Sequence, residues 1–211
     1  MRVRLLLDDV NLAGRDAALA LLDSHPNIEV RVYNPFARRN GVGRALTNSL
    51  ASNDVTPNHA AYARRRERMV DSGMELHEWR PDAASCRELV ENAAACVPPH
   101  VFALHAKTCV LDRHTVYVGS LNLNMRSRYL NAESGLVIES PQLADSIARS
   151  IEQNMAPANS WQVERDAQGD LVWRSEASAP GGAQTDREPA TSWARRMRSG
   201  FFALWPMEKY L

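Results

Sequence analysis

Residues 104–122 read LHAKTCVLDRHTVYVGSLN, and this stretch predicts a single β-hairpin around which the rest of the chain is organised. His105 and Lys107 stand two positions apart on its first strand, so they share one face, because side chains alternate along a strand. Apolar side chains occur on both faces of that strand, which predicts burial in a sheet covered on both sides. Asp-Arg-His then turns the chain, and the β-branched and aromatic run 115–118 is typical of a second strand.

The end of the second strand carries groups suited to binding a phosphate. Gly119 lets a bound group approach the backbone, while Ser120 and Asn122 add a hydroxyl and an amide. They join the imidazole of His105 and the ammonium of Lys107. An imidazole can attack phosphorus or protonate a leaving oxygen, and a fixed cation with hydrogen-bond donors stabilises charge on the non-bridging oxygens. This inventory predicts chemistry on a phosphodiester with no metal and no cofactor.

The spacing His-x-Lys-x4-Asp-x6-Gly-Ser-x-Asn, which runs from His105 to Asn122, resembles the HKD motif of the phospholipase D superfamily. The continuation Arg-Ser-x3-Asn-x-Glu, ending at Glu133, also resembles that family. The resemblance implies these roles: His105 as a catalytic imidazole, Lys107 and Asn122 as phosphate ligands with Ser120 and Gly119 beside them, Glu133 as the hydrogen-bond partner that orients His105, and Asp112 as a structural residue. The alternative for His105 alone is a buried histidine satisfied by a neighbour.

The resemblance covers most of the chain. From His59 to the end, the sequence is similar to the second half of bacterial cardiolipin synthases of the C type, and residues 3–36 are similar to a piece of the first half. The implied fold is α/β, a phospholipase D-like mixed β-sheet flanked by helices on both faces. The implied activity is phosphatidyl transfer or phosphodiester hydrolysis on a phospholipid, through a phosphohistidine.

The chain departs from the family by containing a single His-x-Lys pair. Two-motif members bring one hairpin from each half, so that one histidine becomes phosphorylated and the other protonates the leaving alcohol. One hypothesis is a homodimer that supplies the second motif in trans, and another is a truncated, non-catalytic lipid-binding remnant. Whether His105 is nucleophile or general acid, and which alcohol accepts the group, stay open.

A single-motif nuclease is a further alternative, because it would share the chemistry but act on nucleic acid. The 25 Lys and Arg residues balance 25 Asp and Glu residues, giving a formal net charge of zero. Neutralising many phosphates requires a concentrated basic surface, so nucleic acid is not the expected partner.

The predicted organisation begins with a βαβ unit, formed by strands over 3–7 and 28–33 and a helix over 16–22. Residues 34–57 read mainly as a loop, with one short helix near 44–50. The predicted domains are 1–174, phospholipase D-like, with 1–36 as a partial first-half remnant and 59–174 as the motif-bearing half; 175–190, a flexible linker; and 191–211, an amphipathic C-terminal segment.

The C-terminal segment has two interpretations. Its apolar residues fall on one helical stripe, whereas its arginines lie elsewhere and Phe202 lies on the polar side. The stripe comprises Trp193, Met197, Phe201 and Leu204. Such a helix either lies in a membrane interface or packs back on the domain. The N-terminal apolar run is too short to span a membrane, so the predicted location is cytoplasmic, with peripheral contact to the inner membrane.

The three cysteines, Cys86, Cys96 and Cys109, lack metal-ligand spacing. Their odd number predicts free thiols in a reducing compartment. Cys109 shares a strand face with the predicted catalytic pair, but the pattern favours a small buried core residue over a reactive thiol.

Overall fold

The structure is a computed structural model that describes residues 2–7, 29–32, 43–96, 102–122, 127, 130–175 and 184–204. The chain forms two compact units. The first comprises Met1–Arg39, His105–Ser150 and Glu208–Leu211, and the second comprises Asn40–Leu104 and Ile151–Met207. These limits differ from the sequence-based domain boundaries, and that functional division stays a prediction.

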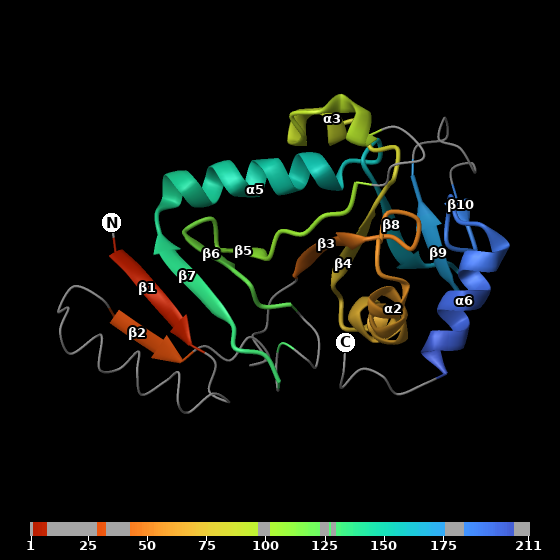
Figure 1. Cartoon of the computed structure of the whole chain (residues 1–211), viewed down its shortest axis with the longest axis horizontal. Helices are drawn as coiled ribbons and strands as arrows, with labels where there is room; N and C mark the ends of the chain where they lie inside the picture. The colour runs from red at the N-terminus through yellow and green to blue at the C-terminus, as the bar shows by residue number, and fades with distance from the viewer. Residues whose placement is uncertain are drawn as a thin grey trace. The chain divides into compact units, whose positions relative to one another are not determined.

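The first unit is built on a five-stranded mixed sheet in the order β2-β1-β7-β6-β5 (Figure 1). Its strands are β1 (Arg2–Leu7), β2 (Glu29–Val32), β5 (Thr108–Leu111), β6 (Thr115–Gly119) and β7 (Ser134–Glu139). β1 and β2 are parallel, and the other pairs are antiparallel. The two predicted N-terminal strands are therefore confirmed. The helix predicted between them lies outside the described residues.

The predicted hairpin is confirmed as β5 and β6, which are joined by the three residues Asp112, Arg113 and His114. Asp112 and Arg113 have φ angles of 53° and 48°, and the His114 N–H donates to the Leu111 carbonyl at 3.0 Å. Positive φ values at two consecutive positions let the chain reverse within a few residues, and aspartate tolerates this conformation better than most residues.

Two details of the hairpin prediction are wrong. Strand β5 begins at Thr108, so His105 and Lys107 lie in the segment just before it. β5 also lies at the edge of its sheet, and none of its residues is fully buried, so the predicted burial on both faces does not occur. An apolar run shows that a strand is partly covered, but the neighbours that decide its position come from distant segments.

The second unit contains a five-stranded mixed sheet in the order β10-β9-β8-β4-β3. Only β3 and β4 pair in parallel; the other pairs are antiparallel. Its strands are β3 (Arg44–Asn48), β4 (Glu75–Trp79), β8 (Ser160–Arg165), β9 (Leu171–Arg174) and β10 (Gln184–Thr185). Its helices are α2 (Thr56–Asp71), α3 (Cys86–Leu89), the 3-10 helix η1 (Ala93–Cys96) and α6 (Trp193–Ala203). Helix α5 (Pro141–Met155) runs from the first unit into the second.

Two apolar clusters cover the two faces of this second sheet. On one face, Leu76, Trp161 and Trp173 pack against side chains of α2 such as Met69. On the other face, Trp79 packs with Cys86 of α3 and with η1. Successive side chains of β4 alternate between these clusters, as the strand period requires. The predicted α/β class with mixed sheet and flanking helices is confirmed, with the strands divided between two sheets.

Three local predictions for the second unit fail. Residues 44–48 form strand β3, because parallel pairing with β4 outweighs the weak local preference. The described end of the predicted linker, residues 184–190, includes β10, and the Glu188 carboxylate bonds His59 of α2 at 2.9 Å. Cys86 and Cys96 form a disulfide, so free thiols are confirmed for Cys109 alone, and that residue is exposed rather than buried. The cysteine count therefore gives no support for a reducing compartment.

None of the helices in the described ranges is long and apolar enough to cross a membrane.

Candidate active site

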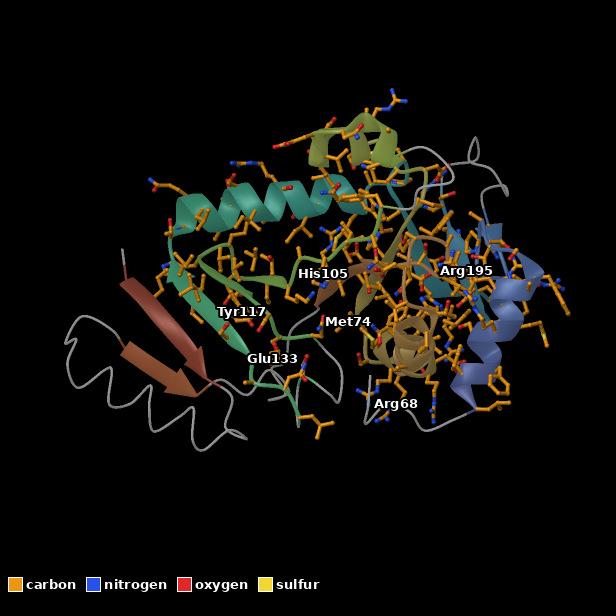
Figure 2. The ribbon with its side chains drawn as sticks, in the orientation of Figure 1. Arg68, Met74, His105, Tyr117, Glu133 and Arg195 are labelled. Atoms are coloured by element: carbon orange, nitrogen blue, oxygen red, sulfur yellow. A yellow bond between two sulfur atoms is a disulfide. The ribbon has the colours of Figure 1, made fainter. Side chains whose placement is uncertain are left out.

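The candidate site lies where β6 ends beside the start of β7. The backbone N–H of Gly119 donates to the Lys107 carbonyl at 3.0 Å, which continues the hairpin ladder beyond the first residue of β5. Gly119 also pairs with Gly135 of β7. This pairing brings Lys107, Ser120 and Glu133 to one end of the sheet although they come from three segments. Figure 2 shows Glu133 near the start of β7, with Tyr117 and His105 on the neighbouring hairpin.

The Glu133 carboxylate is the centre of a hydrogen-bond cluster. It accepts from the Ser120 hydroxyl at 2.5 Å and from the Asn131 amide at 3.1 Å. The Ser120 oxygen in turn accepts from the Ser134 N–H at 3.0 Å, and the Asn122 N–H donates to the hydroxyl of the buried Ser127 at 3.2 Å. These bonds fix the chain on both sides of the predicted phosphate ligands.

The charges of the site favour an ionised pair. Burial alone would raise the pKa of Glu133, but hydrogen bonds from Ser120, Ser127 and Asn131 and the Lys107 charge hold it below its usual value. Partial burial lowers the pKa of Lys107, while the attraction of Glu133 acts in the opposite direction. The Lys107 amine also donates to the backbone carbonyl of His105 at 2.8 Å. The lysine thus bonds its own chain segment and is attracted by the Glu133 carboxylate.

The predicted residues take different places in this arrangement. Lys107, Ser120 and Glu133 lie at the same end of the sheet, where Gly119 donates to the Lys107 carbonyl and pairs with Gly135. Asp112 lies in the hairpin turn, and its structural role stays a prediction. His105 and Asn122 are exposed. Among the residues described, Glu133 bonds Ser120 and Asn131 rather than the His105 imidazole, so the orienting role predicted for Glu133 stays a prediction, as do the catalytic and ligand roles of the set.

Tyr117 was not predicted as a site residue, yet it shapes this end of the sheet. Its ring lies across both Gly119 and Gly135, because a Cβ built on either glycine would overlap Tyr117 atoms. Its hydroxyl accepts from the Leu121 N–H at 3.4 Å. Burial raises the pKa of Tyr117, and the nearby charge of Glu133 adds to this effect. The signal in the sequence was the pairing of two glycines beside an aromatic residue, which becomes visible only when β6 and β7 are aligned.

We expect Gly135→Ala to destabilise the protein by about 1–3 kcal/mol, because the new methyl group forces the Tyr117 ring off the sheet and breaks its bond to Leu121. Urea unfolding measures the change. Gly200→Ala is the matched control, since nothing lies within 4 Å of a Cβ there. Combining Gly135→Ala with Tyr117→Ala removes the clash, so a double variant that loses the full sum of the single effects would contradict the explanation.

No group of three or more His, Cys, Asp or Glu side chains within the described part of the chain is arranged to hold a metal ion. Chemistry without a metal stays a prediction.

The family model described as cardiolipin synthase, PLD-like domain, matches residues 1–155. The chain belongs to this family. The predicted resemblance to the phospholipase D superfamily is thereby confirmed. Residues from His105 to Glu133 fall inside the matched region, so the hairpin and its carboxylate cluster are part of the family domain.

Curated relatives agree with this assignment. Cardiolipin synthase C of Escherichia coli strain K12 is 38% identical over 176 residues, which cover 81% of this chain and 35% of that protein. An uncharacterised protein of Helicobacter pylori strain 26695 is 31% identical over 109 residues, or 52% of this chain and 20% of that protein. The chain therefore spans about a third or less of these relatives.

Among solved structures, the chain has a loose likeness to Nuc, a phospholipase D family member from Salmonella typhimurium. The superposition covers 77% of this chain and 80% of that chain at 15% identity, with a TM-score of 0.35.

Proposed function

We propose that the chain transfers or hydrolyses the phosphatidyl group of a phospholipid through a covalent phosphohistidine at His105. The observation that carries the proposal is the cluster at the end of β6, where the Ser120 hydroxyl bonds the Glu133 carboxylate and the Lys107 ammonium, attracted by that carboxylate, donates to the backbone carbonyl of the exposed His105. Membership of the cardiolipin synthase PLD-like family supports a phospholipid as the substrate.

In the proposed reaction, an imidazole nitrogen of His105 attacks phosphorus. A P–N bond forms while the P–O bond to the leaving alcohol breaks, and that alcohol takes a proton from a second imidazole. An acceptor alcohol or water then loses its proton to the second imidazole and attacks phosphorus, which breaks the P–N bond and frees His105. Lys107 stabilises the negative charge on the non-bridging oxygens throughout.

The second imidazole comes from another copy of the chain. The sequence holds a single His-x-Lys pair, and general acid–base assistance is worth about 10²–10⁴-fold, so a site with one imidazole would be a poor catalyst. A two-fold homodimer supplies two identical hairpins to one site.

The test is to trap the covalent intermediate. Purified chain is incubated with vesicles of labelled phosphatidylglycerol, quenched without acid and digested for mass spectrometry. We expect a phosphatidyl adduct on the peptide that contains His105, together with a released or transferred phosphatidyl product. An adduct on another residue would overturn the assignment. Turnover of a labelled oligonucleotide in place of the lipid would favour the nuclease alternative, and no turnover of either would favour a non-catalytic remnant.

A further inference from the structure

Helix α6 exposes a stripe of large apolar side chains. Trp193, Met197, Phe201 and Leu204 follow one another at intervals of three or four residues, which places them on one face of a helix. Their exposed fractions are 73%, 56%, 57% and 82%. A surface helix of a globular domain ordinarily turns such a stripe toward the core. Here the stripe faces outward along the whole helix.

Side chains outside the stripe anchor α6 to the second unit. Arg195 donates to the backbone carbonyls of Ala51 and Asn53, and Arg196 donates to the Glu188 carbonyl at 2.8 Å. Ser199 lies buried on the same side. The helix lies alongside α2, as Figure 1 shows. The exposed stripe therefore belongs to a docked helix and not to a fraying end.

Further contacts fix the first turns of the helix. The Ser192 hydroxyl caps the helix by accepting from the Arg195 N–H at 3.3 Å, and Arg198 donates to the Thr56 hydroxyl at 3.0 Å. With its polar side held by these bonds, α6 cannot rotate its apolar side inward without breaking them. The sequence left membrane contact and packing on the domain as alternatives. In the described structure the polar face provides the packing, and the four side chains of the stripe stay exposed.

The charge around the stripe identifies the partner. Between Trp193 and Leu204 the helix has three arginines and no acidic residue. In helical projection, Arg196 and Arg198 lie on the two sides of the stripe. Arg198 is exposed although it bonds Thr56, and a long cationic side chain beside an apolar face can reach the headgroup level, while tryptophan favours the boundary between apolar and polar layers. Anionic headgroups complement this pattern.

A second copy of the chain fits the stripe less well. Two α6 helices facing each other would bring six arginines together without a counter-charge on either helix. The stripe also has four side chains, whereas a stable protein interface uses about 20–30 residues on each side. We propose that α6 docks on an anionic lipid bilayer by inserting this stripe into the interfacial layer. The surface belongs to the second unit, so the proposal does not rest on the chemistry of the hairpin.

The experiment measures sedimentation of the whole chain with phosphatidylcholine vesicles that contain or lack phosphatidylglycerol. The variant Met197→Gln/Phe201→Gln removes half of the stripe at exposed positions. We expect it to lower partitioning onto anionic vesicles by about tenfold or more, because each apolar side chain that moves from water into the interfacial layer adds to the binding free energy. The matched control is Leu89→Gln/Leu130→Gln, which removes two exposed leucines elsewhere, at 43% and 62% exposure, and leaves partitioning unchanged.

Several outcomes would overturn the proposal. Equal binding of the stripe variant and the wild-type chain removes the role of α6. Equal binding to vesicles with and without phosphatidylglycerol removes the anionic partner. Absence of vesicle binding, together with a wild-type self-association that the stripe variant abolishes, assigns the stripe to a second copy. Circular dichroism of each variant confirms that the fold is retained, which the exposure of the replaced side chains predicts.

Discussion

His105→Ala is expected to lower phosphatidyl transfer by at least about 10³-fold, because the imidazole forms the covalent bond to phosphorus and, in a two-fold dimer, also supplies the proton of the leaving group. No other described group of the cluster replaces it. Ser120 already donates to the Glu133 carboxylate, and the Lys107 ammonium has no lone pair for attack. The measurement is initial rate with labelled phosphatidylglycerol at saturating substrate.

The matched control is His114→Ala. His114 is an exposed residue next to the turn of the same hairpin, with a side-chain contact to Thr115 at 3.3 Å. Its removal takes away an imidazole of the same hairpin without touching the cluster at the end of β6, so activity should stay near that of the wild-type chain. Equal activity in wild type and His105→Ala would refute the proposed chemistry.

Mixing His105→Ala with the wild-type chain tests whether a second copy of the chain completes the site. After subunit exchange between equal amounts of wild type and His105→Ala, a shared site leaves about a quarter of the pairs fully active, because both members must carry the imidazole. If each chain has an independent site, about half of the wild-type specific activity remains. Specific activity is therefore measured across a series of mixing ratios. A straight line through the series would contradict a site completed in trans.

Glu78→Ala is expected to lower the free energy of unfolding by about 3–5 kcal/mol, because it takes from a buried guanidinium the fully buried one of its two carboxylate partners. Glu78 is completely buried in β4 and accepts from Arg66 of α2 at 3.0 Å. The same carboxylate accepts from the Tyr62 hydroxyl at 2.9 Å and the Trp173 indole N–H at 2.8 Å. Thermal and urea unfolding followed by circular dichroism measure the loss.

Arg66 ties this network to the C-terminal part of the second unit. Its guanidinium bonds Glu188 at 3.0 Å, and Glu188 bonds His59 at 2.9 Å. The Cζ atom of Arg66 also lies 4.5 Å from the centre of the Trp173 ring. A loss of 3–5 kcal/mol is a large share of the roughly 5–15 kcal/mol that holds a domain folded, so the variant should melt at a much lower temperature.

Two controls separate the buried network from a general loss of charge. Glu67→Ala removes an exposed carboxylate of α2 that pairs with Arg165, and pairs of this kind contribute little. Replacing both charged partners, as in Arg66→Met/Glu78→Leu, should be less damaging than Glu78→Ala alone, since neither charge is then left buried and unpaired. A double variant at least as unstable as Glu78→Ala would contradict this explanation.

Spacing within short stretches was enough to predict the parts of the molecule that local chemistry determines. The hairpin from residue 104 to 122 was recognisable because alternation, turn residues and motif spacing all act within some twenty residues. The stripe of α6 was recognisable because the helical period fixes which side chains share a face. The membership of the family follows from the same hairpin and from the similarity of the flanking chain.

The partners of these elements could not be predicted from spacing, because strand order decides them. The Ser120–Glu133 bond requires β6 and β7 to be neighbours, and the position of Tyr117 over two glycines requires their register. The arginines of α2 looked alike in the sequence, yet Arg66 is buried and bonds Glu188, a residue 122 positions away. Segment 44–48 became a strand for a similar reason, since its parallel neighbour β4 lies beyond an entire helix.

The sequence by itself determined an imidazole and an ammonium two residues apart before a hairpin that ends in Gly-Ser-x-Asn, and an apolar stripe near the C-terminus. Tertiary structure alone decided that Glu133 holds Ser120, that Cys86 is joined to Cys96, and that α6 docks through its arginines and turns its stripe outward. The physical reason is the distance along the chain over which each kind of interaction acts. A side chain's position along a strand or helix follows from the local backbone period, whereas its burial and bonding partners depend on segments that only folding brings together.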